Sequence, residues 1–250
     1  MNLRFAVVHE AEADFRTATH LADRVLIEAV GWLDEHLVVD QREWIGANPA
    51  GQRLTWKGIP TLAKELGIKA HGHINGEPLE PDAGAARRAI LYVKAVLDDL
   101  AAVVLLRDQD DQRERRDGLE QARGEHLGSP IVLVGLAVVE REAWVLAGFE
   151  PQDGAEQMRL DAERRLLGFY PHERSHELTA CKDDTAPRSP KRALRALTDG
   201  DADRERRCWN DAPLDRLRSR GTQNGLTQYF EEVRTRLAPL IGHVPRRIDS

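Results

Sequence analysis

The segment Val103–Asp111 reads VVLLRDQDD and decides the fold that we expect. Its apolar first half is short and rich in β-branched residues, which predicts a buried strand of a parallel sheet covered on both faces. Three acids follow where this strand meets a loop, at the carboxyl edge where open α/β sheets bind ligands. Because side chains alternate along a strand, Asp108 and Asp110 should point the same way and could share a divalent cation. An acidic turn that opens a helix is the alternative.

Length and composition indicate a globular protein. With 250 residues, 31% charged and 41% hydrophobic, the chain is long enough to bury a core. No apolar run reaches the roughly 20 residues of a membrane span, and the amino terminus has no signal-peptide pattern. Cys181 and Cys208 form neither a disulfide framework nor a convincing zinc site. We therefore expect a cytoplasmic protein that does not bind a membrane.

The charges are distributed unevenly along the chain. The whole sequence has 36 Lys+Arg against 42 Asp+Glu, whereas residues 188–250 have 14 against 9. An acidic amino-terminal part suits a metal site and a mildly basic tail suits contact with a polyanion. Solvated helix faces are the plainer explanation.

Acids also follow a predicted strand at the start of the chain. The run Arg4–Val8 predicts a strand, and apolar residues at every fourth position then predict a helix over residues 15–33. Glu10 should therefore lie at the carboxyl edge, just before a helix. Glu12 and Asp14 would fall in the first helical turn, where acids favour the helix dipole; capping is an alternative for both and the preferred role for Glu12.

A third strand shows the same pattern. The run Ile131–Val139 predicts a buried strand, and Glu140 and Glu142 follow it as the next helix begins. Right-handed crossovers would bring the three strands into one parallel sheet with their carboxyl ends together. Carboxylates gathered there would repel one another unless a cation neutralised them, and hard oxygen ligands suit Mg²⁺ or Mn²⁺.

Two of these motifs, taken in order, resemble a known fold. The first is VVHEAEAD at Val7–Asp14, and the second is LRDQD at Leu106–Asp110. Together they resemble the TOPRIM fold of topoisomerases, primases and OLD-family nucleases. The EREAW stretch at Glu140–Trp144 is similar to small stand-alone TOPRIM-like proteins, many of them linked to phage defence. The resemblance covers roughly residues 4–150.

The resemblance implies a role for each acid. Glu10 would be the general acid/base or a metal-linked carboxylate, and Asp108 and Asp110 would be metal ligands. Glu140 or Glu142 would help to hold a second metal, and Asp14 belongs to the same expected metal set. The family also implies a catalytic lysine, for which Lys182 and Lys191 are the candidates, with a surface lysine as the alternative.

The sequence departs from the family pattern in two respects. Ala11 stands where the family usually has glycine, which leaves the backbone less freedom for the approach of a phosphate. No Gly-rich loop of an ATPase is visible, so any ATPase that is needed would be a separate partner.

The segments between the predicted strands are less regular. Leu37–Val39 predicts a short strand, whereas residues 85–97 and 112–123 predict helices. The spacing of His71 and His73 could suit a metal on a strand, although surface histidines are commoner.

The remainder of the chain should be helical. A helix over Gly154–Leu167 would place Met158, Ala162, Leu166 and Leu167 on one apolar side. Further helices are predicted over residues 191–197, 201–208, 213–218 and 226–240, the last with an apolar stripe that suits a core or a homodimer. A phosphate-contacting patch or a solvated loop could be formed by Arg216, Arg218, Arg220, Thr222, Gln223 and Asn224.

These observations predict an α/β, TOPRIM-like, mainly parallel sheet flanked by helices. Residues 1–150 would form the catalytic domain and residues 151–250 a helical C-terminal extension. The expected function is Mg²⁺- or Mn²⁺-dependent hydrolysis of phosphodiester bonds in DNA or RNA, in an anti-phage defence setting. An inactive module that binds and regulates a protein or nucleic-acid partner is the alternative. A phosphotransfer enzyme with Asp108 as its nucleophile is a third reading.

Overall fold

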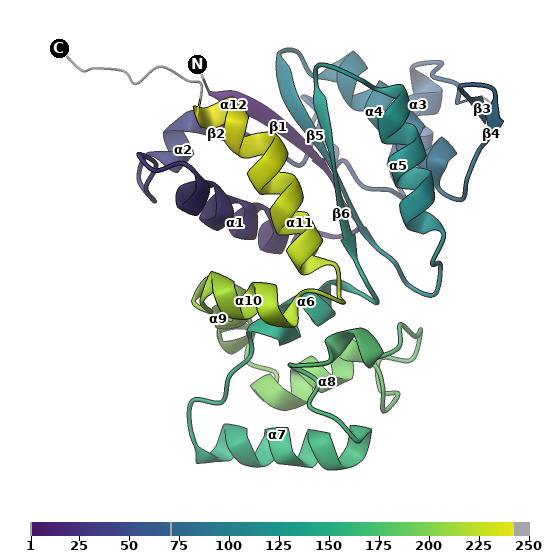
Figure 1. Cartoon of the computed structure of the whole chain (residues 1–250). Coiled ribbons are helices and arrows are strands. Elements are labelled where there is room, and N and C mark those ends of the chain that lie inside the picture. The colour runs from purple at the N-terminus through teal and green to yellow at the C-terminus, as the bar shows by residue number, and fades with distance from the viewer. Residues whose placement is uncertain (1, 71, 243–250) are drawn as a thin grey trace. The chain divides into compact units, whose positions relative to one another are not determined.

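A four-stranded sheet, described in a computed structural model, organises the fold. The model describes residues 2–70 and 72–242 (Figure 1). The strands are β1 (Leu3–Val8), β2 (Arg42–Ile45), β5 (Leu100–Asp108) and β6 (Ile131–Ala137), in the order β2-β1-β5-β6. The protein is thus α/β with a mainly parallel sheet, as the sequence predicts.

The strand β1 pairs in parallel with both of its neighbours. The chain therefore leaves β1 first toward β2 and later toward β5, and this reversal of strand order is where open α/β sheets form a crevice at their carboxyl ends. The last residue of β1, Val8, pairs with Leu105, so β5 runs three residues further, to Asp108.

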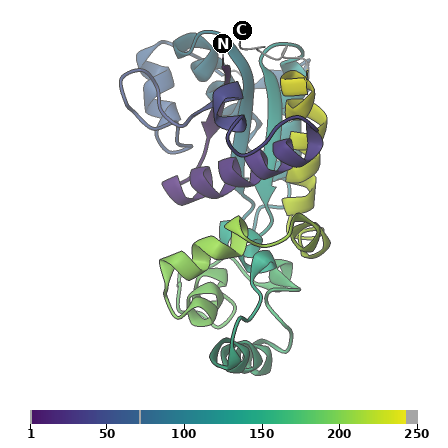
Figure 2. The ribbon, with the colours of Figure 1, turned by 90° about the vertical axis from the view of Figure 1, so that its left-hand side faces the viewer.

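Helices cover both faces of this sheet, which explains why its strands are continuously apolar. Phe5 to Val8 and Ala102 to Leu106 are buried without alternation. Figure 1 shows α1 (Glu12–Ala29) on one face together with η2 (Val233–Leu237), with which it packs. In the turned view of Figure 2, α1 runs in front of the strands. The other face carries α4 (Ala83–Val96) and α5 (Arg115–Glu125).

The predicted strand over Leu37–Val39 is wrong. The Asp34 carboxylate accepts hydrogen bonds from the backbone N–H groups of His36 and Leu37, which turns the chain into the short helix α2 (Val38–Gln41). The edge strand β2 follows instead. The Asp23 carboxylate accepts hydrogen bonds from the Arg42 guanidinium and from the Trp44 indole, which fixes β2 to α1.

The smaller elements complete the order of the chain. They are α3 (Ile59–Glu65), β3 (His73–Ile74), β4 (Glu77–Pro78), α6 (Arg141–Gly148), α7 (Gly154–Leu167), η1 (Ser175–Glu177), α8 (Pro190–Thr198), α9 (Ala202–Asn210), α10 (Leu214–Arg220), α11 (Leu226–Glu232) and α12 (Ala238–Gly242). His71 lies outside the described residues, and His73 is exposed in the β3–β4 hairpin. No helix among the described residues is both long and apolar enough to cross a membrane.

The chain divides into two compact units. Unit 1 comprises the described parts of residues 1–106, 117–134 and 230–250, and unit 2 comprises residues 107–116 and 135–229. The expected boundary after residue 150 lies inside unit 2. The division differs because the loop after β5 and the end of β6 belong with the helices, whereas residues 230–242 belong with the sheet.

The helix α6 forms the centre of unit 2. Nearly all of it is buried, and it packs against α8, α9, α10 and η1. Gly148 allows the closest of these approaches, because a Cβ there would lie 1.7 Å from the Cys208 carbonyl oxygen. The surrounding apolar core includes Phe149, Leu160 and Leu194.

The helix α7 has the bounds that the sequence predicts, but the side of the helix that is buried is not the predicted apolar side. Leu167 is buried as expected, but Met158, Ala162 and Leu166 are exposed. The buried side carries Leu160 together with two glutamates. Glu156 accepts from Arg204, and Glu163 accepts from Arg192. The prediction for this face is wrong because arginines of later helices neutralise acids that local periodicity assigns to solvent.

Candidate functional site

The segments that carry the acids of β5 and β6 are joined by backbone hydrogen bonds within unit 2. Beyond the last residue of β5, the backbone N–H of Gln109 donates to the Ala137 carbonyl at 2.7 Å, and that of Asp110 donates to Val139 at 3.0 Å. These bonds form an isolated antiparallel bridge between Asp110 and Val139. The loop after β5 is thereby fixed to the segment that carries Glu140 and Glu142.

The backbone of this bridge is strained. Asp110 has a φ of 51° and Val139 a φ of 74°. Aspartate tolerates the left-handed region, but for a β-branched residue such as Val139 it is strongly unfavourable. Such strain is concentrated at functional sites, where the surrounding structure enforces it.

Two buried arginines hold the aspartates. The Asp108 Oδ1 atom accepts a 2.9 Å hydrogen bond from the Arg141 backbone N–H, at the start of α6. Arg115 donates to the Asp108 carbonyl oxygen and, at 2.9 Å, to Asp110 Oδ2. The Asp110 side chain is 45% exposed, so it remains accessible from solvent.

Glu140 is the most deeply buried of the four acids, at 6% exposure. Its Oε1 atom lies 3.4 Å from the Lys191 ammonium, whereas its Oε2 atom has no hydrogen-bond partner among the described residues. Burial raises the pKa of this carboxyl, and the charges of Glu142 and Asp110 add to the effect, against the attraction of Lys191. The cluster thus favours a proton, or another positive charge, beside Glu140.

Lys191 is the lysine that the structure brings to the acids. Burial alone would lower its pKa, but the carboxylates of Glu140, Glu142 and Asp184 together raise it, so the ammonium stays protonated. Asp184 lies 3.7 Å away. The other sequence candidate, Lys182, is exposed in the preceding loop and makes no ion pair among the described residues.

Glu142 belongs to a separate part of the cluster. The Arg141 guanidinium lies 3.0 Å from Glu142 and 2.9 Å from Glu205 of α9, so one cation serves two acids. No three His, Cys, Asp or Glu side chains of the described residues are grouped so that they could hold a metal ion.

Glu10 and Asp14 belong to unit 1. Glu10 is exposed between β1 and α1. Its role as general acid/base or metal-linked carboxylate stays a prediction. Asp14 caps α1, since its Oδ2 atom accepts a 2.6 Å hydrogen bond from the Ala11 backbone N–H. Ala11 has a φ of −138°, an extended conformation that any residue adopts. This position therefore does not require glycine. His9 is buried beside Phe15, and burial lowers its pKa.

The predicted arginine patch is mostly used inside unit 2. Arg220 donates to the Phe149 carbonyl and to Glu150, and Arg216 also pairs with Glu150. Asn224 is fully buried and donates to the Ala143 carbonyl. These residues fix the ends of α6, which explains their polar character without a phosphate.

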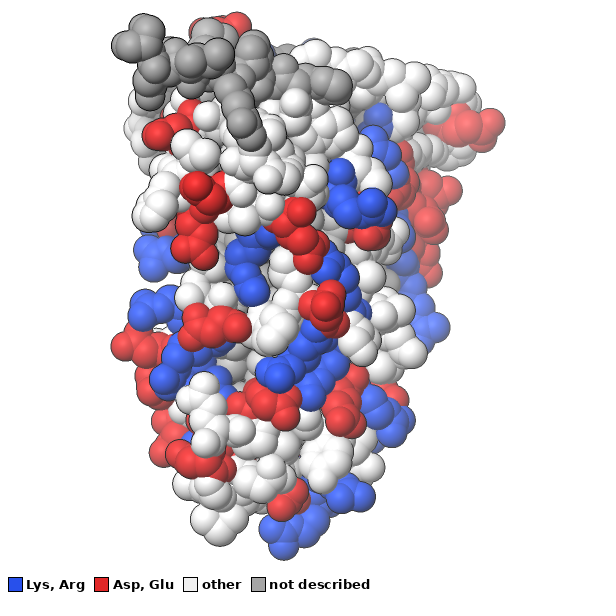
Figure 3. Space-filling model, turned by 60° about the vertical axis from the view of Figure 1, so that its left-hand side comes forward, with Lys and Arg blue, Asp and Glu red and all other residues white. Residues whose placement is uncertain are grey.

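Sequence reasoning missed three residues of the site. Arg141 lies between Glu140 and Glu142, and Arg115 follows Asp110 in the same charged segment; the alternation of acids with arginines was the available signal. Glu205 is far away in sequence and had no signal. Figure 3 shows that acidic and basic side chains are intermingled on the face drawn.

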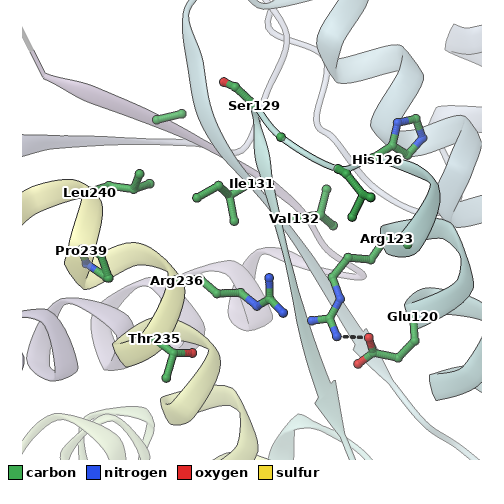
Figure 4. Close-up of a pocket in the computed structure, with 14 residues that line it drawn as sticks. Glu120, Arg123, His126, Ser129, Ile131, Val132, Thr235, Arg236, Pro239 and Leu240 are labelled. Atoms are coloured by element: carbon green, nitrogen blue, oxygen red, sulfur yellow. Dashed lines mark ion pairs between the residues drawn. The ribbon is translucent and has the colours of Figure 1, made fainter.

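A hollow lies in unit 1, and none of the predicted site residues lines it. Its volume is about 880 Å³, and Figure 4 shows that β6, α5 and the η2–α12 segment supply its lining. Its two arginines already have ion-pair partners, because Arg123 pairs with Glu120 and Glu232, and Arg236 lies 3.0 Å from Glu232. Its lining is otherwise mainly apolar.

Comparison with known proteins gives no identification. Neither protein-family models, nor curated proteins, nor solved structures gave a match to this chain.

Proposed function

We propose that the acids after β5 and β6 bind a divalent cation and hydrolyse phosphodiester bonds in nucleic acid. The observation that carries the proposal is the Glu140 carboxylate, which is buried with one oxygen that lacks a partner among the described residues. A buried polar atom without a partner is costly, and a bound cation would satisfy it. The raised pKa of Lys191 is consistent with this, since the carboxylates of Glu140, Glu142 and Asp184 raise it against burial, whereas burial is the main cause of the raised pKa of Glu140.

Asp110 and Glu140 are our candidates for the two carboxylates that would hold the cation, since Mg²⁺ keeps several waters and needs only one or two carboxylates. Asp110 is accessible and has Arg115 as its ion-pair partner, whereas Asp108 and Glu142 are tied to Arg141. A bound Mg²⁺ or Mn²⁺ would polarise the phosphate and lower the pKa of an attacking water.

The chain's own cations would support this reaction. The Lys191 ammonium, which stays protonated, would stabilise negative charge that develops on the phosphate. Arg115 and Arg141 keep the aspartates in position through bonds to backbone and side chain. Glu10 belongs to unit 1 and is not included in this site; its role as acid/base remains an implication of the TOPRIM-like motif.

Cleavage of a substrate panel tests the proposal. Plasmid DNA, single-stranded DNA and total RNA would be incubated with Mg²⁺, Mn²⁺ or EDTA, for the wild type and for Asp108→Ala. We expect metal-dependent cleavage that is lost in this variant. Lys191→Ala should be strongly impaired and Lys182→Ala should retain activity, as its matched control. Full activity in purified Asp108→Ala, or no cleavage under any condition, would overturn the proposal.

The second candidate is a non-catalytic module that binds and regulates a partner, either a protein, such as a separate ATPase, or a nucleic acid. It is favoured by the cations that already serve the acids, namely Arg115, Arg141 and Lys191. Calorimetric titration with Mn²⁺ separates the two functions. The nuclease should bind Mn²⁺ and lose this binding in Glu140→Gln, whereas the regulator should not bind the ion. In a phage-infection assay, the regulator alone should keep its effect after Asp108→Ala.

A further inference from the structure

A small hollow beside the acid cluster has no role in the site described above. It lies within unit 2, has a volume of about 260 Å³ and is formed by α6, α8 and α9. Its lining consists of Glu142, Lys191, Leu194, Arg195, Thr198, Gly200, Ala202 and Glu205. Because Glu142 and Lys191 also belong to the acid cluster, a ligand in this hollow would touch the proposed catalytic site.

The size of the hollow limits what can enter it. Its volume is just below the roughly 300 Å³ at which small-molecule pockets usually begin. A single nucleotide unit is on this scale, whereas a base that remains paired in a duplex is not.

Each charged side chain that lines the hollow, except one, has an ion-pair partner among the described residues. Glu142 and Glu205 share the Arg141 guanidinium, and Lys191 is paired with Glu140 and Asp184.

Arg195 is the exception. It is exposed and makes no ion pair among the described residues. It follows Lys191 by one turn on the same face of α8, about 6 Å further along the helix axis. A phosphate group is the natural partner for such a guanidinium.

We propose that this hollow binds the nucleotide next to the bond that is cut, and that Arg195 holds its phosphate. The carboxylate oxygens of Glu142 and Glu205 can accept from the N–H groups of a base, so the mixed lining suits a nucleotide better than a simple anion. The substrate is therefore single-stranded nucleic acid, or an unpaired segment of it. This inference rests on the proposed function and names its substrate class.

Fluorescence anisotropy tests the inference without cleavage. A labelled single strand of mixed sequence, and the same sequence as a duplex, would be titrated in EDTA and in Ca²⁺. The wild type should prefer the single strand. Arg195→Ala should weaken single-strand binding about tenfold, as expected for loss of a charged hydrogen bond. The slope of log affinity against log salt concentration should decrease by the amount expected for the loss of about one phosphate contact.

The matched control is Arg165→Ala on α7, which also removes an exposed arginine that has no ion pair among the described residues. It should bind like the wild type. Equal affinities of the Arg195 and Arg165 variants, or a preference for the duplex, would overturn the inference. A failure of the proposed function gives a different result from a failure of this inference. If only the proposed function fails, Arg195-dependent binding of the single strand persists, but no metal ion supports cleavage.

Discussion

Asp110 and Val139 lie opposite each other in an isolated antiparallel bridge, and both have a positive φ. The bridge joins the acids after β5 to those after β6, so the strain lies at the centre of the candidate site. Asparagine, aspartate and glycine tolerate this backbone region, but valine does not.

The strain at Val139 predicts an inverted order of stability between two variants. Val139→Gly should be more stable than Val139→Ala by about 1 kcal/mol, because glycine has no penalty in the left-handed region. The same pair at Val134, inside β6, should show the opposite order. Urea unfolding of the four variants measures both differences. If Val139→Ala were more stable than Val139→Gly, the backbone at residue 139 would not be strained.

Glu140→Gln should keep or raise the stability of the protein at neutral pH. Burial raises the pKa of Glu140 in the folded state, so its contribution to stability is complete below the unfolded pKa and is lost as the pH rises through the folded value. The melting temperatures of wild type and variant should therefore converge in acid.

The control is Glu163→Gln, at a buried glutamate that is paired with Arg192. It should lower the melting temperature, because Arg192 then loses its carboxylate. A larger loss in Glu140→Gln than in Glu163→Gln would refute this view of Glu140.

His172 should make the protein less stable as the pH falls. Burial, helped by Arg220 and Arg216 against Glu150, lowers the pKa of His172 from 6.5 to about 4. Stability is therefore present above pH 6.5 and is lost as the pH falls toward 4, by at most about 3 kcal/mol. His172→Phe keeps a ring against Phe149 and Tyr170 and should flatten this dependence in urea unfolding at several pH values. An unchanged slope would assign the effect to other groups.

Arg204→Ala should destabilise the protein by about 3–5 kcal/mol, because it leaves a buried glutamate without its partner. The Arg204 guanidinium contacts both oxygens of Glu156, at 2.6 and 2.9 Å, and its side chain is only 4% exposed. Arg206→Ala on the same helix removes an exposed pair with Asp203 and should cost less than about 1 kcal/mol. Chemical denaturation should separate the two variants clearly, and equal losses would contradict the burial of the first pair.

The orientation of α7 can be tested with two leucines. Leu160 is 3% exposed and Leu166 is 55% exposed. Leu160→Ala should cost about 2–5 kcal/mol, whereas Leu166→Ala should stay within about 0.5 kcal/mol of the wild type. Thermal unfolding measures both losses. A larger loss in Leu166→Ala than in Leu160→Ala would show that the predicted apolar side of α7 is the buried one.

The sequence by itself determined the class of fold and the positions of the acids. Continuous apolar runs predict buried strands of a covered sheet, and β1, β5 and β6 lie where those runs lie. This works because burial on both faces of a parallel sheet leaves a local pattern in each strand. The acids that follow β5 and β6 were visible for the same reason, since each directly follows its run.

Only the tertiary structure decided which groups meet these acids. Lys191, rather than Lys182, contacts Glu140, and Glu205 shares Arg141 with Glu142. The buried face of α7 was decided in the same way, by Arg192 and Arg204 from later helices. A helix period records which residues share a face, but the side that is buried depends on partners elsewhere in the chain. Ion pairs between distant segments leave no local pattern, because they arise only when packing brings the segments together.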